Sequence, residues 1–479
     1  MLFDSQSFLI FLPIVFLAHW FLLSKTKTSQ NFLLLIASFY FYASWDWRFL
    51  FLLIFSILIN YISGILISLS NSNKKILLIV ALSVNIGLLG FFKYYNFFID
   101  TFNSLLLSVG INQSFHTLYI ILPVGISFYT FHGMSYIIDI YNNKTEYTKN
   151  LLDYSLFVSY FPLLVAGPIE RAGHLLPQLK VKRQFNYLQA TEGLKQILWG
   201  LFKKMAIADL CAGPVDSIFT NYETLPGSTL ILGAFLFSIQ IYCDFSGYSD
   251  IALGVSKLFG INLLKNFNYP YFSRDIAEFW RRWHISLSSW FKDYLYIPLG
   301  GSKGGTWMRV RNTFIIFIIS GFWHGANWTF IMWGALNALY IMPSIIMKSN
   351  RRSLNVVAEN NLLPSLKEVV QILITFTLTM FAWIVFRAND ISTAISYIFG
   401  IFNTSLFSYS SYFSHQLIFL LITFLVIVEW IGRRNNFALE YFGKKLYRPF
   451  RWLFYILLIF IIASLTQPNI TPGFIYFQF

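Results

Sequence analysis

Long apolar runs separated by short polar and basic segments dominate the pattern along this chain of 479 residues. No charged residue occurs in 49–73, and none occurs in 312–347. A helix needs about 20 predominantly apolar residues to cross the hydrocarbon core of a bilayer. The pattern therefore predicts an α-helical membrane protein with about 10 to 13 embedded helices, in one membrane-embedded domain over 1–479.

Several of these runs are too short for a straight crossing. We expect such segments to be re-entrant or half-helices, which are tolerated where protein or a water-filled cavity covers their backbone. The apolar segments lie near residues 7–23, 31–43, 49–69, 76–98, 115–140, 152–166, 190–208, 228–256, 312–333, 334–347, 369–386, 416–431 and 451–466.

Composition supports this interpretation and excludes other classes. Apolar residues make up 56% of the chain and charged residues only 12%, whereas roughly a quarter of a soluble domain is charged. Disorder requires low hydrophobicity and high charge. An outer-membrane barrel requires alternating segments of about ten residues, which the sequence lacks. The fold class is therefore an all-α polytopic membrane protein.

The net charge of +14 is explained mainly by Lys and Arg in cytoplasmic loops, so we expect membrane lipid and no nucleic acid as a partner. Its distribution is uneven, because 257–311 holds nine Lys or Arg and three acids. The same stretch is rich in aromatic residues, which favour the membrane interface. We expect an interfacial or re-entrant region here, with a simple cytoplasmic loop as the alternative.

One histidine, His324, lies within the uncharged run 312–347, in SGFWHGANWT at 320–329. Ionisable groups at membrane depth are costly and are candidates for function. Gly321 and Gly325 allow another backbone or a substrate to approach closely. Burial favours a neutral imidazole, which can accept a proton from a hydroxyl. We expect this span to carry a catalytic histidine; a histidine that only bonds between helices is the structural alternative.

His284 is the second candidate, in WRRWHISLSSW at 280–290. On a continuous helix Trp280, Trp283 and His284 would share one face, and the neighbouring arginines would disfavour protonation of the imidazole. Without further context, a surface histidine is the simpler interpretation of His284.

Polar residues also end the apolar run that contains YCDFSGYSD at 242–250. Buried carboxylates need partners, so Asp244 and Asp250 either line a substrate tunnel, together with Ser246, or form ion pairs with nearby arginines. No metal site is expected, because the chain has no zinc-protease motif and its histidines share no ligand spacing. ATP-driven transport is not supported, because no phosphate-binding loop is present.

These motifs, together with DYLYIPLGG at 293–301, resemble the membrane-bound O-acyltransferase (MBOAT) family, and within it the bacterial alginate O-acetyltransferase (AlgI-like) type. The resemblance implies a bundle of helices around a central funnel or tunnel. It implies that His324 is the catalytic histidine and that His284 is a second polar position of the active site. Trp280, Trp323 and Asn327 join Asp244 and Ser246 as expected tunnel residues.

The resemblance also implies the reaction and its participants. An acetyl group from a cytosolic thioester would cross the membrane for O-acetylation of an exported, alginate-like polysaccharide, usually with an extracytoplasmic SGNH-type acetyltransferase as partner. We expect no tightly bound cofactor, acetyl-CoA as acyl donor, and a multi-pass location in the bacterial cytoplasmic (inner) membrane. The residues expected to contact the phosphates of the carrier are Arg281, Arg282, Lys292 and Arg309.

Three alternatives stay open at this point. The acceptor could be peptidoglycan or another cell-wall polymer, and D-alanyl transfer is a less favoured reaction. The chain could instead be a proton-coupled transporter or flippase, although the inverted repeat typical of such proteins is not seen. A non-catalytic scaffold for polymer secretion is the third possibility.

Overall fold

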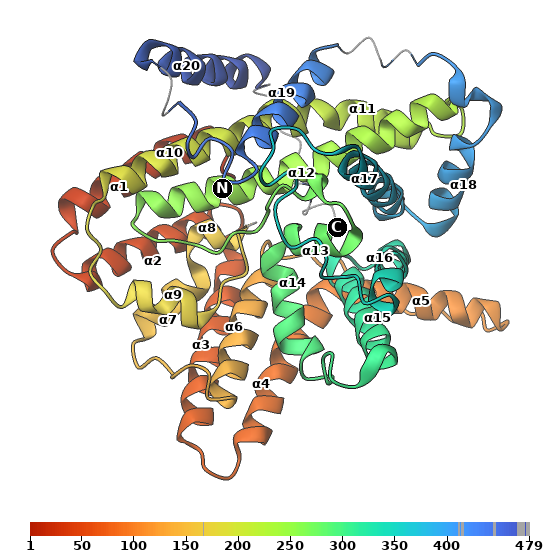
Figure 1. Ribbon diagram of the computed structural model, residues 1–479. Coiled ribbons are helices and arrows are strands. Elements are labelled where there is room, and N and C mark those ends of the chain that lie inside the picture. Colours follow the sequence, from red (N-terminus) through yellow and green to blue (C-terminus); the bar gives the residue numbers. More distant parts are fainter. Residues whose placement is uncertain (166, 411, 413–415, 444–446, 467–474, 476–479) are drawn as a thin grey trace. The chain divides into compact units, whose positions relative to one another are not determined.

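The computed structural model describes residues 1–165, 167–410, 412, 416–443, 447–466 and 475 (Figure 1). Over these residues the regular secondary structure is helical, without a strand, which confirms the predicted all-α class. The chain forms two compact units, Met1–Tyr187 with Leu258–Leu264 and Leu188–Lys257 with Lys265–Phe479.

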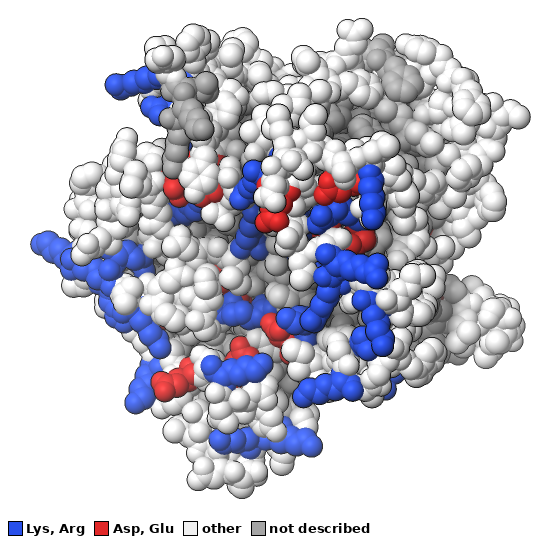
Figure 2. Space-filling model, in the orientation of Figure 1, with Lys and Arg blue, Asp and Glu red and all other residues white. Residues whose placement is uncertain are grey.

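Six helical segments in the described part of the chain are long and apolar enough to cross a membrane. This finding confirms a polytopic membrane protein, and Figure 2 shows broad uncharged areas beside clustered Lys and Arg side chains on the face that it displays. Three further apolar helices have 10–17 residues. The six segments are Arg48–Leu69, Lys74–Ser108, Gly227–Leu258, Trp328–Ile346, Leu366–Arg387 and Arg448–Leu465.

The first unit contains nine α-helices and two π-helical turns in its described residues. Helices α3, α4 and α6 pack against one another, and a reciprocal pair of amide hydrogen bonds joins α3 to α4, between Asn60 and Asn85 at 2.9 and 3.1 Å. The helices are α1 (Gln6–Leu17), α2 (Lys27–Ala43), α3 (Arg48–Leu69), α4 (Lys74–Leu89), α5 (Tyr95–Ser108), α6 (Ile126–Tyr141), α7 (Leu151–Ser159), α8 (Phe161–Leu164) and α9 (Ala172–Leu179), with π turns at Ala18–Leu22 and Gly90–Tyr94.

The second unit holds the candidate site. Its helices are α10 (Tyr187–Leu201), α11 (Asp209–Thr220), α12 (Gly227–Leu258), α13 (Ile276–Arg282), α14 (Ile285–Phe291), α15 (Gly305–His324), α16 (Trp328–Ile346), α17 (Leu366–Arg387), α18 (Ile391–Ile401), α19 (Gln416–Gly432) and α20 (Arg448–Leu465). Shorter turns lie at Phe202–Ala208, Pro270–Phe272, Lys292–Tyr296 and Thr404–Phe407.

Glycines bring α10 against α12. A methyl group added at Gly200 would collide with the carbonyl oxygen of Gly247, and one at Gly254 would collide with that of Gly193. Small residues at a helix crossing allow two backbones to approach closely, which is how embedded helices associate without a hydrophobic driving force between them. This crossing places the polar residues of α12 next to the turn that follows α10.

The uncharged run 312–347 forms two helices, and the break between them lies at 325–327 instead of at 333/334, where the two expected apolar segments meet. Helix α15 ends at His324, Gly325 has an extended backbone, and the side chain of Asn327 caps α16 by accepting a hydrogen bond from the Thr329 amide. A polar N-cap satisfies an amide that would otherwise be unpaired at a helix start. Helices α15 and α16 lie side by side (Figure 1), so His324 is at the turn of a helical hairpin.

Candidate active site

Aromatic rings surround His324 at the end of α15. The imidazole is buried, and its ring centroid lies 5.0 Å from that of Trp323, 5.1 Å from that of Trp333 and 5.5 Å from that of Phe386. These neighbours come from α15, α16 and α17. The close approach of α15 to α16 depends on Gly321, because a methyl group there would overlap the Phe330 carbonyl. The hairpin therefore holds the imidazole in a fixed, largely apolar environment.

His284 is not on a helix face shared with Trp280 and Trp283, as a continuous helix would require. Helix α13 ends at Arg282, Trp283 is extended, and His284 caps α14 with φ 44° and ψ 54°. A left-handed backbone is unfavourable for a residue with a Cβ atom and persists where the surroundings over-determine it, often at functional sites. The sequence carries no turn signal at this position, because glycine is absent.

The His284 ring is 1% exposed and lies among three aromatic side chains. Its centroid is 4.6 Å from that of Phe245, 6.5 Å from that of Phe267 and 6.1 Å from that of Trp323. Trp323 therefore contacts both histidines, and the structure brings the two candidates into one aromatic cluster. Neither ring nitrogen of His284 has a hydrogen-bond partner among the described residues.

Burial keeps His284 neutral. His284 lies outside the six candidate spans, and burial lowers the pKa of its imidazole from the ordinary 6.5 to about 3. Burial, not the neighbouring arginines of the sequence argument, is the cause. Between pH 6.5 and about 3 the unfolded chain binds a proton at His284 that the folded protein does not bind, so this group makes the folded state less stable as the pH falls through that range.

A cavity of about 370 Å³ lies beside this cluster. Its lining residues include Trp280 and Arg281 of α13, Ile285 of α14, Lys292 of the turn after α14, and Ser320 of α15. Ser320 precedes His324 by four residues and therefore lies on the same helix face, and Ile285 directly follows His284. The cavity thus reaches one helical turn from His324, with mostly apolar walls and two basic side chains.

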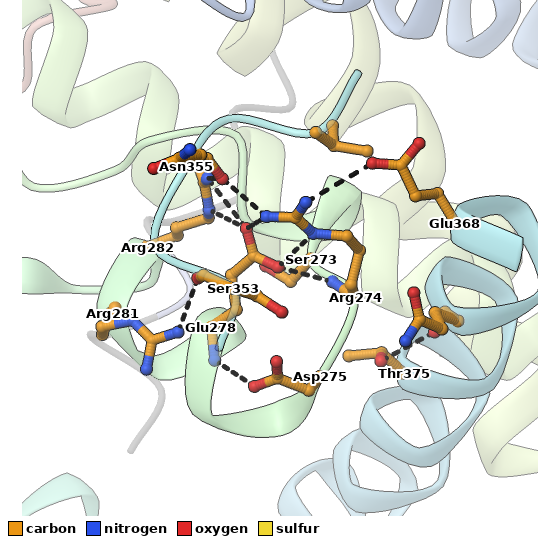
Figure 3. Close-up of polar contacts among 12 residues, drawn as sticks. Ser273, Arg274, Asp275, Glu278, Arg281, Arg282, Ser353, Asn355, Glu368 and Thr375 are labelled. Carbon is orange, nitrogen blue, oxygen red and sulfur yellow. Dashed lines mark hydrogen bonds and ion pairs between the residues drawn. The ribbon is translucent and has the colours of Figure 1, made fainter. Parts of the chain in front are cut away.

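Arg281 forms hydrogen bonds with two backbone carbonyls through its guanidinium group. It donates hydrogen bonds to the carbonyl oxygens of Asn350, at 2.7 Å, and of Ser353, at 2.8 Å (Figure 3). It therefore fastens the segment between α16 and α17 at the edge of the cavity. Trp280 donates from its indole to Asn337 at 3.3 Å and contacts Trp333 at 5.6 Å.

Other predicted carrier contacts lie elsewhere. Arg282 is buried and pairs with Glu278 at 2.9 Å, in a network that includes Arg274 and the Asn355 carbonyl (Figure 3). Arg309 bonds only to the Gly305 carbonyl, at 3.4 Å, among the described residues, and does not line the cavity.

Asn327, an expected tunnel residue, caps α16 and donates to the Asn389 carbonyl at 2.8 Å.

The polar residues of α12 pair with lysines, so the prediction of arginine partners is wrong. Asp244 lies 2.7 Å from Lys204, and its other oxygen accepts the Ile475 amide. Ser246 accepts a 3.0 Å hydrogen bond from Lys203, whose ammonium group also lies 2.5 Å from Asp250. Sequence reasoning missed these lysines, although Lys203 and Lys204 were visible as charges inside the apolar segment 190–208.

The described residues contain no group of three His, Cys, Asp or Glu side chains that could hold a metal ion. The arrangement instead offers two imidazoles in an aromatic cluster and an apolar cavity with a basic edge. Buried imidazoles accept and donate protons, and basic side chains bind phosphate. Proton transfer in a water-excluded site next to a pocket for an anionic, partly apolar molecule is the chemistry that it supports.

The exchange of His284 for glycine or alanine tests the left-handed turn. Both changes delete the imidazole, but only glycine adopts this backbone without strain. We expect the His284→Gly protein to be more stable than the His284→Ala protein by about 1 kcal/mol, measured by unfolding in detergent. At Ser396, an exposed position within α18, alanine should be the more stable choice. Equal stability of the two His284 variants would contradict the strain.

Comparison with known proteins places this site in context. The family model described as "MBOAT, membrane-bound O-acyltransferase family" matches residues 16–384, which include both histidines. The chain is 42% identical over 398 residues to the probable alginate O-acetylase AlgI of Pseudomonas aeruginosa, covering 82% of this chain and 73% of that protein. It is 38% identical over 447 residues to the probable alginate O-acetylase AlgI of Azotobacter vinelandii, covering 91% and 86%.

A relative with another named substrate is also similar. The chain is 37% identical over 431 residues to the peptidoglycan O-acetyltransferase of Helicobacter pylori, covering 84% of this chain and 79% of that protein.

Proposed function

Because the chain belongs to the membrane-bound O-acyltransferase family and is an O-acyltransferase, we propose that it moves an acetyl group from a cytosolic thioester across the membrane to an exported polysaccharide. The observation that carries this proposal is a mostly apolar cavity lined by Ser320, one helical turn from His324, and by Ile285, the neighbour of His284, next to the aromatic cluster that holds both histidines. The cavity suits the arm of a thioester donor, and the histidines suit the acyl transfer.

In this proposal His324 is the general base. Its imidazole takes the proton of the acceptor hydroxyl while the oxygen attacks the thioester carbonyl. The carbon–sulfur bond breaks, a carbon–oxygen bond forms, and the proton passes to the departing thiolate, so no proton is gained or lost overall. His284 positions or polarises the reacting groups, since neither of its ring nitrogens is hydrogen-bonded to a residue that the structure describes.

In this proposal the donor enters the cavity beside its two basic side chains, Arg281 and Lys292. Acetyl-CoA combines a short acyl group and an extended arm with phosphates that Arg281 and Lys292 can attract. The mostly apolar walls of the cavity suit the uncharged part of such a donor. We propose the cytoplasmic (inner) membrane as the location, because the thioester is cytosolic and the polymer is exported.

An alginate-like exopolysaccharide is the acceptor that we favour, since the two alginate O-acetylases cited above share 42% and 38% identity with the chain. An extracytoplasmic SGNH-type acetyltransferase would complete the transfer to the sugar. Peptidoglycan is the second candidate, supported by the relative that is 37% identical. Supplying each purified polymer to the same membranes separates the two.

The experiment that tests the function uses labelled acetyl-CoA and membranes that contain the chain. We expect base-labile label on the polysaccharide, and no such label with membranes that lack the chain. Label on polysaccharide in equal amount from both membranes would contradict the proposal. Transfer that requires a D-alanyl carrier protein in place of acetyl-CoA would identify the aminoacyl reaction instead.

Lys292 should act on the phosphates of the donor and not on its acyl group. A charge contact at a partly exposed site contributes up to about 1 kcal/mol, which corresponds to about fivefold in affinity. We expect Lys292→Gln to raise the KM for acetyl-CoA by about that factor and to leave kcat nearly unchanged.

Two controls make this test specific. Arg309→Gln should leave the KM unchanged, because Arg309 does not line the cavity. With acetyl-pantetheine, which lacks the phosphates, the Lys292→Gln and unmodified proteins should behave alike. A rise of KM that persists with acetyl-pantetheine would contradict a phosphate contact.

A further inference from the structure

We propose that Asn266 is a positioning residue for His284, which it holds in its left-handed turn between α13 and α14. This inference rests on the proposed function, because it assigns Asn266 to acyl transfer through a histidine of the active site. Asn266 lies in the irregular segment that follows α12. It forms no hydrogen bond with the imidazole of His284, so it would act through the backbone of the turn.

Backbone hydrogen bonds fasten the turn on both sides of His284. The Ile285 amide donates to the Asn266 carbonyl at 2.8 Å, and the Asn268 amide donates to the Arg282 carbonyl at 2.9 Å. The segment 266–268 thus runs alongside the junction of α13 and α14. These two bonds fix the residues immediately before and after Trp283 and His284.

The side chain of Asn266 connects this turn to α12. Its Oδ1 accepts a 3.0 Å hydrogen bond from the Ser286 hydroxyl, and its Nδ2 donates to the Ser249 hydroxyl at 3.1 Å. All three side chains are buried, with at most 3% of each residue exposed. A buried amide satisfied on both ends is costly to remove, because its partners lose their hydrogen bonds without access to water.

Packing and the backbone, without hydrogen bonds from the ring, hold His284 in the described part of the chain. Neither of its ring nitrogens has a partner among the described residues, so within that part of the chain no hydrogen bond orients the ring. Its position follows from the backbone and from packing against Phe245 and Phe267. We call the hydrogen bonds of Asn266 to Ile285, Ser286 and Ser249 the Asn266 clamp. Because Phe245 belongs to α12 and Phe267 directly follows Asn266, this clamp also positions the aromatic neighbours of His284. Without the clamp, the strained backbone would relax and the imidazole would move.

Through Ser249, Asn266 also adjoins the charged cluster of α12. Ser249 follows Ser246 by three residues on one helix face, and Ser246 is held by Lys203. A small cavity of about 20 Å³ is lined by Lys203, Ser246, Ser249 and Asn266 together. The polar face of α12 therefore supports the turn from behind.

The first test compares Asn266→Ala with Ser256→Ala. Ser256 is equally buried on α12 but bonds only to the Ala252 carbonyl of its own helix. A catalytic group displaced by about 1 Å can lose about 10²-fold in rate. We expect Asn266→Ala to lower kcat for acetyl transfer by about 10- to 100-fold with little change in the KM for acetyl-CoA, and Ser256→Ala to retain near-normal kcat. A normal kcat in the Asn266→Ala protein would overturn the proposal.

The second test does not depend on activity. His284→Gly and His284→Ala are each prepared with Asn266 intact and with Asn266→Ala, and the midpoint of unfolding in detergent is measured. With the clamp intact, the His284→Gly protein should unfold at the higher temperature. With Asn266→Ala the difference should shrink toward zero, because the backbone can then leave the left-handed region. An unchanged difference would overturn the proposal.

The two tests distinguish the inference from the function on which it rests. If the unmodified protein transfers no acetyl group from acetyl-CoA, the proposed function fails, yet the unfolding measurements still decide whether Asn266 holds the turn. If transfer occurs and the unfolding difference persists without Asn266, the function stands and the positioning role is wrong.

Discussion

Replacing His324 with glutamine is expected to lower the rate of acetyl transfer by about 10²- to 10⁴-fold, the range that a positioned general base contributes. Glutamine can still form hydrogen bonds in the aromatic cluster, but it cannot accept the proton of a hydroxyl. The ring contacts of His324 with Trp333 and Phe386 show that the residue also fills space, so alanine would add a packing defect that glutamine largely avoids.

The measurement is the initial rate of label transfer from acetyl-CoA in membranes with matched amounts of protein. His116→Gln is the control, since His116 is exposed and lies in the irregular segment before α6; it should retain the normal rate. The KM for acetyl-CoA should change little in the His324→Gln protein, because the base acts on the acceptor. A His324→Gln protein with the normal rate would exclude the base assignment.

Lys203→Met is expected to destabilise the fold by about 3–5 kcal/mol, the cost of leaving a buried charge without its partner. Lys203 is 3% exposed and lies 2.5 Å from Asp250, with a 3.0 Å hydrogen bond to Ser246 and Glu429 at 3.9 Å. Methionine has a similar length but no charge, so the buried Glu429 and the partly buried Asp250 would lose their shared cation. The free energy of unfolding in detergent and the yield of folded protein measure the effect.

A second lysine supplies the matched control. Lys257 lies in the last turn of α12, 4.0 Å from the carboxylate of Glu192, whose side chain is about half exposed, so Lys257→Met should cost less than about 1 kcal/mol. Adding Asp250→Asn to Lys203→Met should restore part of the lost stability, because one unpaired charge is removed. If Lys203→Met and Lys257→Met are equally stable, the buried network does not hold the helices together.

The sequence could predict the class of the fold and the two histidines, and the reasons are local. A long uncharged run directly predicts a segment embedded in a bilayer. The run 312–347 contains a single histidine, His324, which is therefore easy to identify as a candidate. The helix break at Gly325 and Asn327 was less visible. Its glycine and its polar N-cap residue are ordinary turn signals, but the apolar residues on both sides continue the pattern of a single span.

Other features depend on contacts between distant segments. The pairing of Lys203 with Asp250 joins residues far apart in the chain and follows from the glycine crossing of α10 and α12. The left-handed turn at His284 has no glycine to mark it, and it is flanked by long-range hydrogen bonds that the sequence does not reveal, from the Ile285 amide to the Asn266 carbonyl and from the Asn268 amide to the Arg282 carbonyl. The ion pair of Arg282 with Glu278 is likewise visible only in the structure. From the sequence, an arginine in a basic aromatic stretch is expected to bind an anionic ligand.

The most direct test of the central claim is a sided transfer measurement. Sealed vesicles with the chain in one orientation receive labelled acetyl-CoA on the cytosolic side only, with the polysaccharide and any required extracytoplasmic partner on the other side. The account predicts base-labile label on the polysaccharide across the membrane, dependent on His324 and reduced by Lys292→Gln at low donor concentration. Label that crosses equally well in the His324→Gln protein, or that stays on the donor side, would contradict it.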